Sequence, residues 1–188
     1  MYNILHLSAV ELERLVKMAI ELLSPRIDLE DEYFSMMAEF ERSGESYWFF
    51  ADARRDFVAY LRKMDSYTRG EGLPSGFVPY HTFWLVQDET RILGELRLRH
   101  DLTEALAIEG GHIGYNIRPS ERRKGYGKLQ LRLGLEKARE LGLTRVLVTC
   151  NDNNQASARI IEANGGVLSG RGISPDSGAI VRQYWIEV

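Results

Sequence analysis

Apolar positions at helical spacing mark the first 80 residues of the chain. The motif Ser8-Ala9-Val10-Glu11 has the form of a capping box, and it precedes apolar residues that recur every three or four positions. Asp52 is the expected N-cap of a later helix, and a run rich in glycine and proline predicts a loop before residue 81. The predicted elements are a strand over 2–7, helices over 8–23, 29–42 and 52–67, and a loop over 68–80.

The pattern changes after residue 80, where alternating apolar positions predict strands between the helices. The predicted elements are a hairpin of strands 82–86 and 91–99, a strand over 112–117, a turn over 118–124, a helix over 125–141, a strand over 145–150, a helix over 154–163, and strands over 167–171 and 179–187. The last two strands are expected to complete a mixed sheet. This order of strands and helices predicts an α/β (α+β) fold.

Length and composition fit one domain over residues 1–188, made of an N-terminal part (1–80), a core (81–170) and a C-terminal strand (171–188). The chain is 44% hydrophobic and 27% charged, as soluble globular proteins are. A single cysteine, Cys150, excludes an internal disulfide, and the four histidines show no metal-ligand spacing. Without a recognisable signal peptide or a long apolar run, we expect a cytoplasmic protein with neither a metal nor a membrane partner.

Charge is unevenly distributed along the chain. The net charge of −3 argues against a general nucleic-acid binder, yet residues 118–132 carry six basic side chains and one acidic one, Glu121. This concentration of positive charge predicts an anion site in the second half of the chain.

The turn Arg122-Arg123-Lys124-Gly125-Tyr126-Gly127-Lys128 follows a strand and leads directly into a helix. A helix N-terminus exposes unpaired N–H groups, and glycines let a phosphate approach them closely. Gln130 stands where a dinucleotide fingerprint needs its third glycine, and Leu129 stands where a P-loop needs serine or threonine. The turn therefore predicts a different kind of phosphate site, or else a tight turn whose basic residues only begin a solvated helix.

In these features the chain resembles the GNAT superfamily of acetyl-coenzyme A (acetyl-CoA) dependent N-acetyltransferases. Arg122, Gly125 and Gly127 match the Gln/Arg-x-x-Gly-x-Gly/Ala signature, after the strand Tyr115-Asn116-Ile117-Arg118-Pro119 and before the asparagine-led helix Asn154-Gln155-Ala156-Ser157. The stretches 110–115 and 161–166 resemble a branch of predicted acetyltransferases within that superfamily.

The resemblance implies a GNAT-like acyl-CoA N-acyltransferase fold with an extended N-terminal helical region that shapes the acceptor pocket. It also implies that acetyl-CoA is the acyl donor, with its pantetheine arm in a gap between two splayed strands. The residues it implies for cofactor binding are Ile117, Arg122, Arg123, Lys124, Gly125, Tyr126, Gly127, Lys128, Asn154 and Ser157.

Acetyl transfer to an amine needs a neutral attacking nitrogen and an acid for the leaving thiolate. Glu109 and His112 are candidates for the base, although Glu109 could equally be a turn residue and His112 a hydrogen-bonded strand histidine. The family's usual acid, a tyrosine, is replaced by Ile161. Either Tyr115, Ser157 or solvent is then the acid, or the leaving thiolate needs little help.

The expected protein is an N-acetyltransferase for a small-molecule or peptide amine, acting as a monomer or homodimer. The alternative is a non-catalytic module that binds or senses acyl-CoA.

Overall fold

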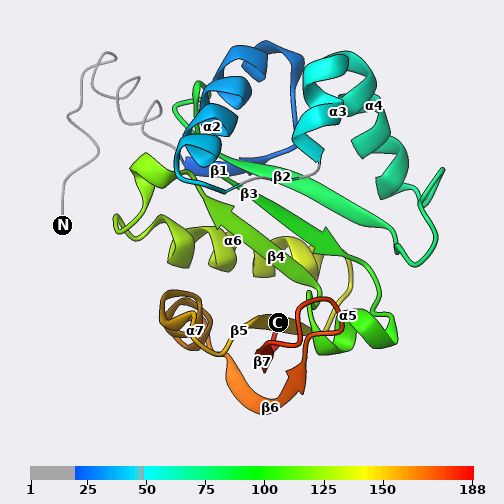
Figure 1. Cartoon of the computed structure of the whole chain (residues 1–188), viewed down its shortest axis with the longest axis vertical. Helices are drawn as coiled ribbons and strands as arrows, with labels where there is room; N and C mark the ends of the chain where they lie inside the picture. The colour runs from blue at the N-terminus through cyan, green and yellow to red at the C-terminus, as the bar shows by residue number, and fades with distance from the viewer. Residues whose placement is uncertain (1–19, 46, 48) are drawn as a thin grey trace, which may run out of the picture.

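The computed structural model describes residues 20–45, 47 and 49–188, and its strands form two antiparallel sheets (Figure 1). One sheet has the order β1-β2-β3-β4, with β1 (Ile20–Leu23), β2 (Tyr80–Gln87), β3 (Arg91–Arg99) and β4 (Ile113–Ile117). The other has the order β5-β7-β6, with β5 (Arg145–Asn151), β6 (Val167–Ile173) and β7 (Ile180–Glu187). The predicted α/β fold class is confirmed, but hydrogen bonding divides the strands between two sheets where the sequence predicted one.

Helices cover both faces of the four-stranded sheet (Figure 1). One face carries α2 (Glu30–Arg42), α3 (Phe49–Arg55) and α4 (Phe57–Thr68), and the other carries α6 (Tyr126–Glu140). The remaining helices are η2 (Ile27–Leu29), α5 (Glu104–Ile108), η3 (Pro119–Glu121) and α7 (Gln155–Glu162). Each helix of the described part is too short or too polar to cross a membrane.

Alternation along the strands builds two separate cores. Leu96 and Leu98 of β3 pack with Leu131 and Leu135 of α6 in one core, which continues into β5, α7 and β7. Trp84 of β2 faces the other way, among the aromatic side chains of the N-terminal helices. The four-stranded sheet is therefore buried on both faces.

The prediction of a helix over 8–23 is wrong at the end of that range, because Ile20–Leu23 forms β1 and pairs antiparallel with β2. In this segment the backbone hydrogen bonds of the sheet override a helical spacing of apolar residues. The rest of that helix and the strand predicted over 2–7 lie outside the described residues.

The helix predicted over 52–67 is two helices, α3 and α4, which separate at Asp56. The backbone of Asp56 is extended, and its side chain accepts a hydrogen bond from the N–H of Ala59, so that Asp56 is the N-cap of α4. Asp52, the predicted N-cap, instead lies inside α3 and forms an ion pair with Lys63. The short helix α5 was not predicted, whereas the elements from β5 to β7 lie close to their predicted bounds.

Candidate active site

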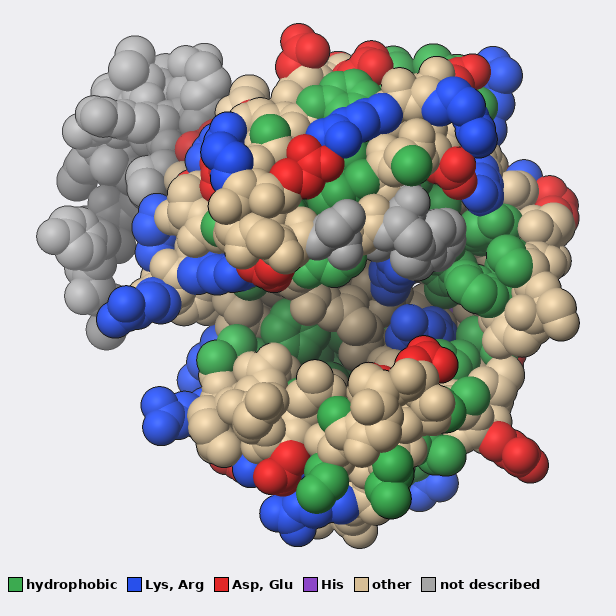
Figure 2. All heavy atoms as spheres, viewed as in Figure 1, with side chains coloured by type: hydrophobic (Ala, Val, Ile, Leu, Met, Phe, Trp, Pro, Cys, Tyr) green, Lys and Arg blue, Asp and Glu red, His purple; other side chains and the backbone are tan. Residues whose placement is uncertain are grey.

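A cleft of about 700 Å³ opens between β4 and α7, and Figure 2 shows a hollow that crosses this face of the molecule. The segment after α2, the strand β4, the turn before α6 and the helix α7 all contribute to its walls. Its lining residues are Glu45, Tyr47, Tyr115, Asn116, Ile117, Glu121, Arg122, Arg123, Gly125, Gly127, Lys128, Asn154, Ala156, Ser157 and Ile160.

The turn before α6 presents unused hydrogen-bond donors to this cleft. Within the part of the chain that the structure describes, the backbone N–H groups of residues 123–127 donate no hydrogen bond. Gly125 has a φ of 88°, and a Cβ added there would meet no atom within 4 Å. The free N–H groups at a helix N-terminus, with open space beside them, suit a phosphate oxygen.

Gly127 has a different role from Gly125. It is buried, and a Cβ added to it would lie 2.7 Å from Cδ1 of Ile160 in α7. The absence of a side chain at this position therefore lets the start of α6 pack against α7.

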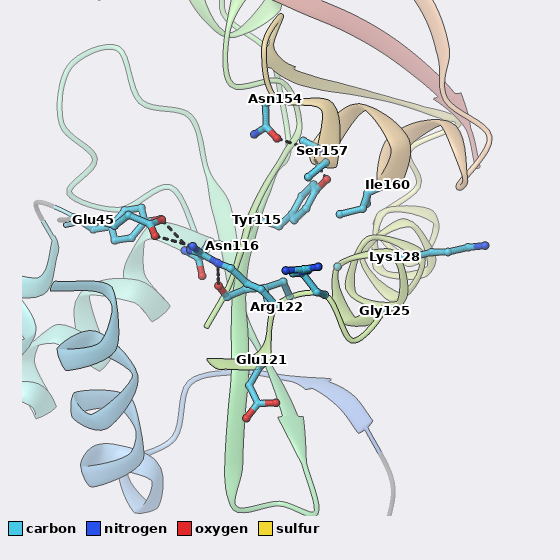
Figure 3. A pocket seen from close by; sticks show the side chains of 15 residues that line it. Glu45, Tyr115, Asn116, Glu121, Arg122, Gly125, Lys128, Asn154, Ser157 and Ile160 are labelled. Atoms are coloured by element: carbon cyan, nitrogen blue, oxygen red, sulfur yellow. Dashed lines mark hydrogen bonds and ion pairs between the residues drawn. The ribbon is translucent and has the colours of Figure 1, made fainter. Parts of the chain in front are cut away.

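The basic side chains around the turn do not all face its N–H groups. Both terminal nitrogens of Arg122 lie 2.8 Å from the carboxylate oxygens of Glu45, and its Nε donates to the carbonyl oxygen of Ile117 at 3.0 Å (Figure 3). Lys124 pairs with Glu121 at 2.9 Å. Hydrogen bonding to Arg122 lowers the pKa of Glu45, so this carboxylate is ionised at neutral pH.

Tyr115 and Ser157 meet within the cleft, where their hydroxyl oxygens lie 3.0 Å apart (Figure 3). Asn154 is the N-cap of α7, and its Oδ1 accepts a hydrogen bond from the N–H of Ser157. Burial raises the pKa of Tyr115 to about 12, although the hydrogen bond with Ser157 acts in the opposite direction. The phenol is therefore protonated at neutral pH and can donate a proton or a hydrogen bond.

The structure does not bring Glu109 or His112 into the lining of this cleft. His112 is buried at the junction of the two sheets, where its N–H donates to the carbonyl of Leu147 at 2.8 Å and its Nδ1 accepts from the N–H of Leu147 at 2.9 Å. Burial lowers the pKa of His112, in keeping with a neutral ring whose Nδ1 is an acceptor. Glu109 is the C-cap residue of α5. The contacts of His112 match the alternative of a hydrogen-bonded strand histidine.

Ile161, which stands where the family has its tyrosine, is fully buried in the core and does not line the cleft. A Cβ added to Gly166 would lie 2.4 Å from its Cγ2, so the turn after α7 closes directly over this side chain. The adjacent residue Ile160 lines the cleft instead. Tyr115 lines the cleft and places its hydroxyl beside α7, at Ser157.

Glu45, Tyr47 and Asn116 also line the cleft, although sequence reasoning did not select them. Glu45 lies 77 positions before Arg122, and only the docking of α2 against the sheet brings Glu45 and Tyr47 to the turn before α6. Asn116 could have been found, because it belongs to the strand that the motif identifies.

Arg118 joins the end of β4 to α2, and it is 1% exposed. Its guanidinium donates to Glu39 at 2.7 Å, to Glu32, and to the hydroxyl of Ser35 at 2.7 Å. The second oxygen of Glu39 accepts a hydrogen bond from the N–H of Ser120, which precedes the turn before α6. This set of four residues, hereafter the Arg118 network (Glu32, Ser35, Glu39 and Arg118), positions the turn relative to the N-terminal helices.

A family model described as an acetyltransferase (GNAT) domain matches residues 20–167. The chain belongs to the GNAT acetyltransferase family. None of the curated proteins that were compared with this GNAT chain matches it.

Solved structures share the GNAT fold at low sequence identity. The microcin C7 self-immunity acetyltransferase MccE, in complex with acetyl-CoA and AMP, has a TM-score of 0.67 at 16% identity, covering 90% of this chain and 92% of its own. RimJ of Mycobacterium smegmatis, in complex with CoA-disulfide, has a TM-score of 0.67 at 14% identity, covering 90% and 85%. An acetyl transferase of Salmonella typhimurium that modifies the N-terminal serine of ribosomal protein L7/L12 has a TM-score of 0.64 at 13% identity, covering 90% and 95%. The fold predicted from the family signature is therefore confirmed.

Proposed function

We propose that this GNAT protein transfers an acetyl group from acetyl-CoA directly to an amine. The observation that carries the proposal is the turn before α6, whose unused N–H groups and open space at Gly125 fit a pyrophosphate. This turn lies in a cleft that also contains the half-buried phenol of Tyr115. Acetyl-CoA and CoA are bound in structures with the same fold, which supports this choice of donor.

In the proposed reaction the amine nitrogen attacks the thioester carbonyl carbon, the new C–N bond forms and the C–S bond breaks. The nitrogen loses one proton and the departing sulfur gains one. Tyr115 is our choice for the group that donates to the sulfur, because it is protonated and Ser157 holds its hydroxyl. The cleft carboxylates Glu45 and Glu121 are both ion-paired, so we expect water to accept the proton that an ammonium acceptor loses before it attacks. Water also accepts the proton that the neutral amine nitrogen loses as the amide forms.

Calorimetric titration with acetyl-CoA tests donor binding. Gly125→Asp places a carboxylate beside the expected pyrophosphate, and repulsion of this kind weakens binding by roughly tenfold or more. Gly142→Asp is the matched control, because Gly142 has a similar positive φ (84° against 88°) and open space, at the far end of α6. A substitution of Gly127 is less informative, because it would also disturb the packing against Ile160.

Saturable binding that Gly125→Asp reduces and Gly142→Asp preserves would support the donor site. A wild-type protein that does not bind acetyl-CoA would overturn the proposal. A mass-spectrometric screen of amines then separates an enzyme from a binding module: binding without acetylation of any amine would favour the non-catalytic alternative.

A further inference from the structure

The guanidinium of Arg122 occupies a site with the chemistry of a cation-binding site. The carboxylate of Glu45 contacts it with both oxygens, and the carbonyl of Ile117 accepts from its Nε. Its central carbon lies 5.7 Å from the centre of the Phe40 ring, within the range of a cation–π contact. A carboxylate, a carbonyl and an aromatic ring together recognise a positively charged group. We call this set, with Tyr47, the Glu45 subsite (Phe40, Glu45, Tyr47 and the Ile117 carbonyl).

The aromatic part of the Glu45 subsite is fixed by packing. Phe40 is fully buried in α2, and the ring of Tyr47 packs edge-on against it at 5.2 Å. Glu45 and Tyr47 both line the cleft, so a ligand in the cleft can reach them. The subsite is thus preformed, and its Glu45 carboxylate lies on the cleft wall opposite α7 (Figure 3).

The guanidinium of Arg122, which occupies the subsite, lies next to the turn where we propose that the donor's pyrophosphate binds. Arg122 directly precedes residues 123–127, whose N–H groups are free to donate hydrogen bonds to phosphate oxygens. A pyrophosphate at this turn would compete with Glu45 for the guanidinium, because phosphate and carboxylate both bind it with two oxygens. After such an exchange, the ionised carboxylate of Glu45 would face the cleft without its counter-ion.

We propose that the Glu45 subsite binds a second cationic group on the acceptor, and that Arg122 occupies it until the donor's pyrophosphate draws the guanidinium away. This inference rests on the proposed function and names the acceptor class: a diamine, or a peptide with a further basic group. The cation at Glu45 is distinct from the reacting nitrogen, because an ammonium ion has no lone pair with which to attack the thioester. Donor and acceptor then bind cooperatively, since the donor empties the subsite that the acceptor fills.

The test measures binding by calorimetry and does not depend on turnover. The probes are CoA, followed by 1,4-diaminobutane and 1-aminobutane titrated into the CoA-saturated protein. The variant is Glu45→Gln. The matched control is Glu41→Gln, which removes an exposed carboxylate of α2 that pairs with Arg54 outside the cleft.

The expected result is a crossed effect. Glu45→Gln binds CoA about two- to five-fold more tightly, because the exposed ion pair with Arg122 no longer has to break. The same variant binds the diamine at least five-fold more weakly, while binding of the monoamine is unchanged. Glu41→Gln alters neither. In the wild-type protein, the diamine binds more tightly with CoA present than without it.

Other outcomes overturn the inference about the Glu45 subsite, and they differ from the outcome that would overturn the proposed function. Weaker CoA binding by Glu45→Gln would mean that Glu45 holds Arg122 in place for the donor. Equal affinities for the two amines, or no detectable binding of the diamine to the CoA complex, would also exclude the subsite. A wild-type protein that does not bind CoA contradicts the donor site itself.

Discussion

Replacing Arg118 with methionine removes the cation that joins the end of β4 to α2. The methionine preserves much of the apolar stem, but it leaves the carboxylates of Glu32 and Glu39 without the guanidinium that contacts them both. Breaking a buried ion pair from one side costs about 3–5 kcal/mol. Glu32 and Glu39 are 21% and 15% exposed, and Arg91 still pairs with Glu32, so we expect the lower end, about 3 kcal/mol.

Urea unfolding measures this loss as a change in the free energy of unfolding at constant m-value. Arg132→Met is the control, because Arg132 pairs with Glu136 on the exposed surface of α6, where the side chains are 59% and 46% exposed. An exposed pair of this kind contributes about 0–1 kcal/mol. If Arg118→Met costs no more than Arg132→Met, the Arg118 network does not stabilise the fold as argued. In a double-mutant cycle, Glu39→Gln should cost less in the Arg118→Met background than in the wild type.

Three further predictions concern the cleft and its surroundings. Tyr115→Phe should lower kcat by about 100-fold. Burial raises the pKa of Tyr115 to about 12, so the phenol should stay protonated at pH 9. If the wild-type kcat falls near pH 9 and Tyr115→Phe abolishes that fall, Tyr115 is not the protonated donor. Gly127→Ala should lower the free energy of unfolding by about 1–3 kcal/mol, measured by thermal or urea unfolding, because the added Cβ clashes with Ile160. Ile160→Val removes the clashing Cδ1 and should restore part of that stability. If it restores none, the packing argument is refuted. Burial raises the pKa of Glu39, but hydrogen bonds, first among them that of Ser120, lower it below its ordinary value. The stability that the Glu39 carboxylate contributes is therefore present above its unfolded pKa of about 4.3 and is lost as pH falls through the lower folded value. Glu39→Gln should flatten the decline of Tm between about pH 5 and pH 2, and an unchanged decline would refute this argument.

The parts of the fold that the sequence predicted are those whose signals are local. A glycine at a helix start, basic neighbours and a preceding strand identified the turn at Gly125 without knowledge of the rest of the molecule. The capping asparagine Asn154 likewise identified α7, and alternating apolar residues identified the hairpin of β2 and β3.

The missed parts depend on contacts between distant segments. Ile20–Leu23 is a strand because β2, about 60 positions later, supplies its hydrogen-bond partners. Glu45 reaches the cleft only through the packing of α2, and no spacing rule connects it to Arg122. His112 could be read as a catalytic or a structural residue until its contact with Leu147 was known. In each case tertiary structure decides among alternatives that the local pattern leaves open.

The Arg118 network also bears on the order in which the chain folds. Its ion pairs connect residues that are 79 and 86 positions apart, so they form only after a long loop has closed. The turn before α6 therefore has these contacts only when α2 is docked on the sheet. A ligand that binds only the finished turn adds its binding free energy to the stability of the whole assembly. Its dissociation constant would thus report on the folding of N-terminal helices that the ligand need not touch.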